Sequence, residues 1–173
     1  MTYLAKAILL SATLGLGLAG CSSMSPNRFD NVTNLNGAGA GGAGTGTASD
    51  PASPAYFQQS VGDRVLFYVD QSTLNPEARL TLDQQARWLI ANRDYQARIE
   101  GHADEQGTRE YNLALGARRA NAVKDYLVAQ GVPDYRLSTI SYGKERPIEI
   151  CSEEACYAKN RRAVTVLQAG AGM

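Results

Sequence analysis

The sequence is poor in the residues that enzymes and nucleic-acid-binding proteins need. Its 173 residues include one histidine, His102, three cysteines, and 17 basic against 17 acidic side chains. A nucleic-acid-binding domain carries a marked basic excess, so the balanced charge argues against that class. The pattern contains no convincing Ser/His/Asp, paired-carboxylate or metal-ligating constellation, so we expect a protein that is not an enzyme and needs no metal or other cofactor.

A long hydrophobic run is also missing. The apolar stretch at residues 7–18 is shorter than the roughly 20 residues that a membrane-spanning helix needs. Lys6 precedes this stretch, and the triplet Leu-Ala-Gly leads directly to Cys21. This order predicts a secretory signal peptide over residues 1–20. A cysteine at this position resembles a bacterial lipobox; the alternative is an ordinary signal peptide followed by a chance cysteine.

The lipobox resemblance implies that Cys21 is lipidated with three acyl chains such as palmitate. Each buried methylene contributes about 0.8 kcal/mol to membrane affinity, and two anchoring signals already give stable attachment. By analogy with bacterial lipoproteins, an Asp after the cysteine retains the protein in the inner membrane. Ser22 stands there instead. The resemblance therefore implies an outer-membrane anchor with the remainder of the chain in the periplasm.

The other two cysteines lie close together in the sequence. Cys151 and Cys156 are separated by four residues. In an oxidising compartment this spacing favours a local disulfide that orders a surface loop. A metal site is the alternative, but it lacks ligands because the only histidine is far away in the sequence.

Composition divides the chain into four parts. Residues 21–60 are predicted to be a flexible linker, because the Gly- and Ala-rich run at residues 36–47 has little to bury. A folded domain is expected over residues 61–168, after the signal peptide and linker, and residues 169–173 form a tail. A linker of about 40 residues spans roughly 30–40 Å on average, which suits a tether.

Hydrophobic periodicity indicates alternating strands and helices within the folded domain. Apolar or alternating runs predict four strands, and three- and four-residue spacing predicts two long helices with one apolar face each. A further helical turn is expected before the last strand. We infer a sandwich in which a four-stranded sheet carries its helices on one face. The expected strands are 65–69, 96–100, 137–142 and 162–167, and the expected helical segments are 77–92, 109–130 and 153–159.

The loop at residues 101–108 and the helix after it contain the candidate binding residues. At 100° per residue, Arg119 lies at the edge of the buried helix face, whereas Arg118 points to solvent. A buried arginine needs a partner, and Asp104 is the natural candidate. The pair is either a structural ion pair, or a site for a ligand with both a carboxylate and an ammonium group, such as an amino-acid end group.

Two further groups near this loop have more than one interpretation. His102 lies beside the candidate site, but a histidine at a strand end is more often structural than a ligand contact. The basic cluster of Lys159, Arg161 and Arg162 either attracts an anionic surface or is a solvated strand end.

Several sequence blocks in order resemble the peptidoglycan-associated lipoproteins of the OmpA-like domain family. The resemblance covers roughly residues 63–168 and implies an α+β, βαβαβ-type sandwich with a four-stranded mixed sheet. In that family the residues matching Asp104 and Arg119 bind the diaminopimelate of the peptidoglycan stem peptide. Many relatives carry an acidic residue in place of Tyr68, so only backbone contacts are expected to persist there. The blocks are 101–108, 111–116, 118–123, 141–147 and 159–164, and the positions at or beside the implied site are Phe67, Tyr68, His102, Asn112 and Leu115.

The resemblance also implies a cellular role and partners. It implies a noncovalent tether between the outer membrane and the cell wall within the Tol–Pal system, which supports envelope integrity and constriction during cell division. The implied partners are peptidoglycan, TolB and other Tol proteins, with wall and TolB binding mutually exclusive. The alternative is a protein that mainly binds TolB and contacts the wall only secondarily.

Overall fold

The computed structural model describes residues 46–150 and 152–169. The signal peptide, Cys21, residues 21–45 of the expected linker, Cys151 and the tail from residue 170 lie outside these residues. Within residues 46–150 and 152–169, no helix has the length and apolar character required to cross a membrane.

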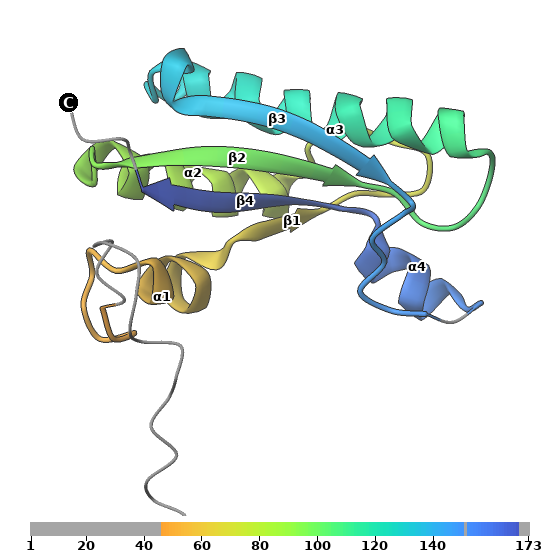
Figure 1. The fold of residues 1–173 in the computed structure, drawn as a ribbon, viewed down its shortest axis with the longest axis horizontal. Coiled ribbons are helices and arrows are strands. Elements are labelled where there is room, and N and C mark those ends of the chain that lie inside the picture. The colour runs from red at the N-terminus through yellow and green to blue at the C-terminus, as the bar shows by residue number, and fades with distance from the viewer. Residues whose placement is uncertain (1–45, 151, 170–173) are drawn as a thin grey trace, which may run out of the picture. The chain divides into compact units, whose positions relative to one another are not determined.

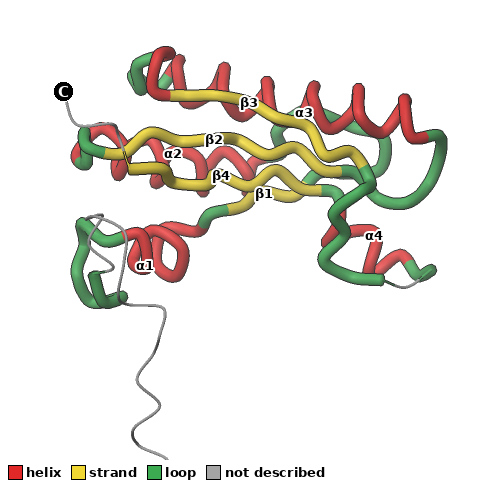
Figure 2. The backbone as a smooth tube through the Cα atoms, in the orientation of Figure 1, coloured by secondary structure: helices red, strands yellow, loops and turns green. Residues whose placement is uncertain are grey.

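The centre of the fold is a four-stranded mixed sheet (Figures 1 and 2). The strands are β1 (Arg64–Leu66), β2 (Tyr95–His102), β3 (Leu137–Gly143) and β4 (Arg162–Ala169), and their order across the sheet is β1-β4-β2-β3. β4 is antiparallel to both β1 and β2, whereas β2 and β3 are parallel. The predicted four-stranded mixed sheet and α+β class are therefore confirmed.

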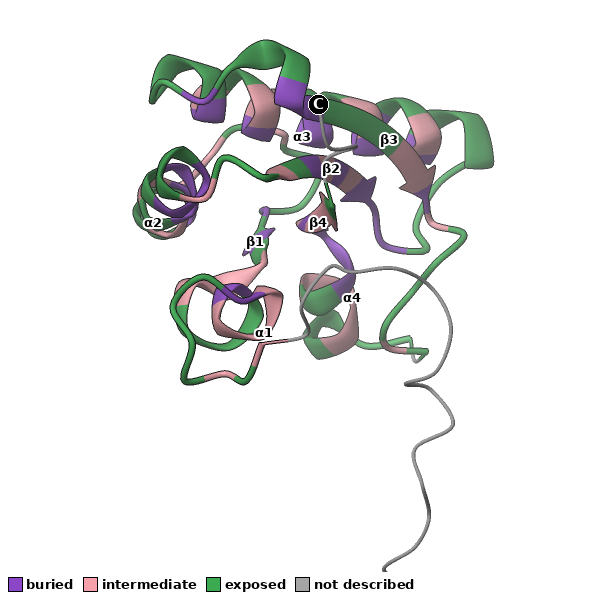
Figure 3. Ribbon diagram, turned by 60° about the vertical axis from the view of Figure 1, so that its left-hand side comes forward, coloured by how far each residue is buried: buried purple, intermediate pink, exposed green. Residues whose placement is uncertain are grey.

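Two long helices, α2 (Pro76–Ala91) and α3 (Arg109–Ala129), pack on one face of this sheet (Figure 1). Each begins at a capping side chain: Asn75 accepts from a backbone N–H of α2, and Thr108 does the same for α3. Their buried faces meet alternate strand residues such as Ile99, and Figure 3 shows these faces turned toward the sheet. The remaining helical segments are short: α1 (Pro54–Tyr56), η1 (Phe57–Gly62), η2 (Asp134–Arg136) and α4 (Glu154–Asn160).

The packed domain begins before residue 61, where composition had predicted its start. Phe57 is fully buried, and its ring lies 4.9 Å from that of Trp88, centroid to centroid. The indole Nε1 of Trp88 also donates to the carbonyl of Pro51 at 2.8 Å. Residues 51–60 therefore pack on α2. The polar composition of this segment did not predict the packing, because the packing depends on one buried aromatic contact, that of Phe57 with Trp88.

A close glycine contact joins α3 to the sheet. A Cβ atom on Gly101 would lie 1.8 Å from the carbonyl oxygen of Gly116, so only glycine allows this approach. Beside it, the hydroxyl of Ser141 in β3 donates to the carbonyl of Leu113 at 2.7 Å. These contacts hold the first half of α3 against the ends of β2 and β3, next to the loop that contains the candidate binding residues.

Candidate functional site

The loop after β2 positions Asp104 in the interior. Only 7% of this residue is exposed, and its Oδ1 accepts from the backbone N–H of Gln106 at 3.3 Å. The ammonium group of Lys144 donates to the carbonyls of Gly107 and Glu105 at 2.7 and 3.3 Å, which holds the loop from outside. The Asp104 carboxylate is therefore fixed in orientation by its own loop.

Arg119 is the largest fully buried side chain of the described residues. Its Nε and Nη1 donate to the carbonyls of Gln71 and His102 at 2.8 Å each, and Nη2 donates to the carbonyl of Tyr68 at 3.2 Å. The guanidinium also lies 5.2 Å from the centre of the Phe67 ring. These bonds join the loop after β1 to the end of β2.

Burial lowers the pKa of Arg119 to about 10, and the nearby Asp104 carboxylate opposes that shift. Arg119 therefore stays protonated at neutral pH. The helical phasing is confirmed, since the adjacent Arg118 is exposed and lies 5.9 Å from the ring of Tyr111.

Asp104 forms its ion pair with Arg161, so the structural Asp104–Arg119 ion pair considered from the sequence is not the arrangement found. Nη1 of Arg161 lies 3.1 Å from Oδ2 of Asp104, and both side chains are less than a tenth exposed. Arg161 also donates from Nε to the carbonyl of Phe67 at 3.3 Å, and from Nη1 and Nη2 to the carboxylate of Glu154. Burial alone lowers the pKa of Arg161, but hydrogen bonds to Glu154 and Asp104 outweigh it and raise the pKa above its usual value.

The interpretation of residues 159–162 as a solvated strand end is wrong for two of the three cations. Arg161 and Arg162 are 5% and 4% exposed, whereas Lys159 is exposed and pairs with Glu149. The reason is topological: β4 is paired on both sides, so Arg162, which begins it, and Arg161, directly before it, enter the interior of the fold. The sequence does place these arginines directly before an apolar strand. It does not show that this strand lies inside the sheet, and that position is what buries the two arginines.

Four other residues that were expected at the site differ in their burial and in the contacts that they make. Phe67 and Leu115 are buried, whereas Tyr68 is 57% exposed and reaches Arg119 only through its backbone carbonyl. Asn112 is 1% exposed and donates from Nδ2 to the carbonyl of Gln106 at 2.8 Å. Its Oδ1 has no hydrogen-bond partner among the described residues, which is uncommon for a buried polar atom.

His102 contributes its backbone rather than its ring to this arrangement. The residue is 2% exposed, and its imidazole lies 5.5 Å from the ring of Tyr142, centroid to centroid. Burial lowers the pKa of His102 to about 4, and the positive charges of Arg162 and Arg146 add to this shift. The imidazole is therefore neutral at physiological pH, and the carbonyl of His102 accepts from Arg119.

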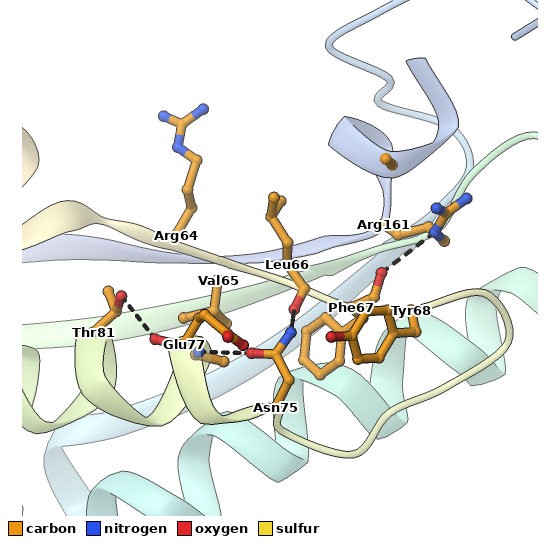
Figure 4. Close-up of a pocket in the computed structure, with 11 residues that line it drawn as sticks. Arg64, Val65, Leu66, Phe67, Tyr68, Asn75, Glu77, Thr81 and Arg161 are labelled. Carbon is orange, nitrogen blue, oxygen red and sulfur yellow. Dashed lines mark hydrogen bonds between the residues drawn. The ribbon is translucent and has the colours of Figure 1, made fainter. Parts of the chain in front are cut away.

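A groove of about 550 Å³ lies along β1 and the start of α2 (Figure 4), and neither Asp104 nor Arg119 lines it. It shares Phe67, Tyr68 and Arg161 with the region just described, and Figure 4 shows the hydrogen bond from Arg161 to the carbonyl of Phe67. No group of His, Cys, Asp and Glu suited to a metal ion occurs within the described ranges. Cys156 is disulfide-bonded, but Cys151 lies outside the described residues, so its pairing with Cys156 stays a prediction.

Comparisons with known proteins identify the family. The model of the OmpA family matches residues 66–161. A peptidoglycan-associated lipoprotein of Rhizobium meliloti (strain 1021) is 49% identical over 166 residues, which are 95% of this chain and 89% of that protein. The chain belongs to the peptidoglycan-associated lipoproteins of the OmpA family. The family resemblance seen in the sequence is confirmed.

Solved structures agree with the OmpA-family assignment. The peptidoglycan-associated lipoprotein from Burkholderia pseudomallei is 38% identical and superposes with a TM-score of 0.62, covering 70% of this chain and 98% of that one. The C-terminal domain of Helicobacter pylori MotB is 23% identical, with a TM-score of 0.59 over 63% of this chain and 86% of its own, and shares the fold. The OmpA-family match ends at Arg161, so it includes Asp104, Arg119 and Arg161.

Proposed function

We propose that this chain binds peptidoglycan noncovalently through the amino-acid end group of diaminopimelate in the stem peptide. In this proposal Asp104 accepts from the ligand ammonium, and Arg119 donates to the ligand carboxylate. The observation that carries the proposal is a buried carboxylate, Asp104, close enough to the buried guanidinium of Arg119 to oppose the lowering of its pKa by burial. Asn112, whose amide oxygen has no partner among the described residues, is joined to the Asp104 loop through Gln106.

The hydrogen-bonding capacity of these groups supports this chemistry. A guanidinium has five N–H donors, and the three carbonyl bonds of Arg119 leave one N–H on each terminal nitrogen. Two such donors match the two oxygens of a carboxylate. Asp104 uses Oδ1 for Gln106 and Oδ2 for Arg161, and each carboxylate oxygen has a second acceptor position. A zwitterionic end group could therefore satisfy both residues.

Access to Arg119 sets a condition on the proposal. The guanidinium is fully buried beneath the backbone at Tyr68 and Gln71, which are themselves exposed. A ligand carboxylate can reach it only when the segment from Tyr68 to Gln71 gives way. The phenol of Tyr111 donates to Asp70, so two α3 side chains, those of Arg119 and Tyr111, hold this segment in place.

The binding role extends to the anchor and the cell envelope. We propose that acylated Cys21 holds the chain in the outer membrane, that the linker spans the gap, and that the folded domain binds the wall without catalysing a reaction. This arrangement would tether the outer membrane as part of the Tol–Pal system and support constriction during cell division. Support comes from the sequence order of signal, cysteine and Gly-rich linker and from relatives named peptidoglycan-associated lipoprotein.

Sedimentation with isolated sacculi tests wall binding. Asp104→Asn keeps the size of the side chain but removes the charge that the ammonium needs, so the amount that co-sediments should fall by about tenfold or more. Arg118→Ala is the matched control, because Arg118 is exposed and should leave co-sedimentation unchanged. Circular dichroism confirms that each variant is folded. Undiminished co-sedimentation of folded Asp104→Asn would contradict the proposal.

A protein partner at the same face is a second candidate, and exposed aromatic residues favour it. Tyr68 and Tyr111, at 57% and 43% exposure, lie next to Arg119 and to the 101–108 loop, and tyrosine is enriched in protein interfaces. We propose TolB as this partner, in competition with the wall. A soluble stem-peptide fragment should displace TolB from the chain. Simultaneous binding of both at full affinity would exclude a shared surface.

A further inference from the structure

Arg161 is shared by two carboxylates with different surroundings. On one side Asp104 is 9% exposed as a side chain, and on the other Glu154 is 68% exposed. Both terminal nitrogens of Arg161 contact Glu154, whereas only Nη1 contacts Asp104. Glu154 therefore forms the two-pronged pair, which is the stronger geometry, and Asp104 forms a single bond.

This division affects the charge that Asp104 can offer to a ligand. If Arg161 paired with Asp104 alone, the two charges would cancel, and the site would retain the positive charge of Arg119. With Glu154 included, one carboxylate compensates Arg161 and the negative charge of Asp104 remains available for a cation. The ammonium of the proposed ligand requires the arrangement that includes Glu154, because only there does Asp104 keep an uncompensated negative charge.

We infer that Glu154 is a positioning residue for ligand recognition: by compensating the charge of Arg161, it leaves the negative charge of Asp104 available to a ligand ammonium, although Asp104 keeps its single bond to Arg161. Glu154 itself does not contact the ligand in this scheme. The inference rests on the proposed function, because it concerns how Asp104 performs its part of that function. It also assigns a role to α4, whose first residue is Glu154 and whose last residue precedes Arg161.

Local structure supports a role for Glu154 that is separate from folding. Its side chain is mostly exposed, so replacing it removes little buried surface. Arg161 would keep its bonds to Asp104 and to the carbonyl of Phe67. The neighbouring Glu153 is also exposed and makes no side-chain cap contact with α4. Glu153→Gln therefore removes the same charge, one residue away, without touching Arg161.

The test is a titration of the full chain with a soluble stem-peptide fragment that ends in diaminopimelate, extended to millimolar concentrations. Glu154→Gln should raise the Kd by about two- to fivefold, the fold-change expected for an exposed ion pair. Glu153→Gln should leave the Kd unchanged, and Glu154→Asp should recover most of the affinity. Thermal unfolding should differ little among these variants.

A double-mutant cycle with Asp104→Asn separates positioning from a general structural effect. In the Asp104→Asn background, Glu154→Gln should have no further effect on the Kd, because there is no carboxylate left to release. An equal fold-change in both backgrounds, or no change in either, would overturn the inference while leaving the proposed function intact. If Asp104→Asn alone does not weaken binding, the proposed function itself fails, and the inference with it.

Discussion

Arg161 and Asp104 form a nearly buried ion pair, with Nη1 of the arginine 3.1 Å from Oδ2 of the aspartate. The two residues are 57 positions apart in the sequence. The pair connects the loop after β2 to the start of β4, and the carbonyl of Phe67 joins the same guanidinium. Arg161 therefore links the end of β1, the candidate binding loop and α4 through one side chain.

Removing the cation of this pair should destabilise the fold. Arg161→Gln leaves Asp104 buried without its ionic partner, and breaking a buried pair in this way costs about 3 kcal/mol or more. Lys159→Gln is the matched control, since its pair with Glu149 is exposed on both sides and should contribute less than about 1 kcal/mol. Urea denaturation measures both values. Similar losses for the two variants would show that burial does not govern the contribution of Arg161.

The two adjacent arginines of α3 should respond very differently to truncation. Arg119→Ala leaves three carbonyl groups without their donor, which should lower the free energy of unfolding by about 3 kcal/mol or more. Arg119→Lys should recover only part of this loss, because one ammonium cannot span three carbonyls. Arg118→Ala should change stability by less than about 0.5 kcal/mol. Equal effects at positions 118 and 119 would contradict the observed burial.

His102 should make stability depend on pH. Its pKa is about 4 in the folded chain against an ordinary value of 6.5, so the unfolded chain binds a proton more readily between these values. Stability should therefore be full above about pH 6.5 and fall by up to about 3 kcal/mol as the pH drops to 4. His102→Phe keeps a ring beside Tyr142 and should reduce this slope in urea denaturation at several pH values. An unchanged slope in the variant would assign the pH dependence to other groups.

The contact between Gly101 and Gly116 should tolerate no side chain. Gly101→Ala places a Cβ against a helix carbonyl at 1.8 Å, and the resulting shift of α3 should cost about 3 kcal/mol or more. Gly107→Ala is a useful comparison. Its φ of +89° is strained for alanine, but the nearest side-chain atom is 3.6 Å away, so about 1 kcal/mol is expected. Thermal unfolding measures both losses of stability. A larger loss for Gly107→Ala than for Gly101→Ala would contradict the close contact between Gly101 and Gly116.

The membrane anchor gives a prediction at the level of the cell. Cys21→Ser removes the thiol that is expected to be acylated, so the chain should be released into the soluble periplasmic fraction. Cell fractionation followed by immunoblotting measures the distribution. Cys156→Ser is the control, because it also removes a cysteine but leaves Cys21 and should keep the chain with the membrane. Retention of Cys21→Ser in the outer membrane would refute lipidation at this position.

Local sequence signals predicted most of the secondary structure. The start of α3 was expected at Arg109, and the helix does begin there, directly after the capping side chain of Thr108. The segment at residues 65–69 was expected to be one strand, but β1 ends at Leu66. After it, the backbone of Phe67 still pairs with Arg161, and the carbonyl of Tyr68 turns to Arg119. A strand pattern cannot report such a turn, because the partner that draws the backbone away lies on another element.

The sequence by itself determined the class of fold, the two helix faces, and which of two adjacent arginines is buried. These properties follow from periodicity and capping, which act over a few residues. Only the tertiary structure decided which cation pairs with Asp104, because Arg161 reaches it through a strand order that places β4 between β1 and β2. The same packing buried Phe57 and extended the domain toward the N-terminus. Ion-pair partners and domain edges depend on which distant surfaces meet, and that information appears only when the sheet has formed.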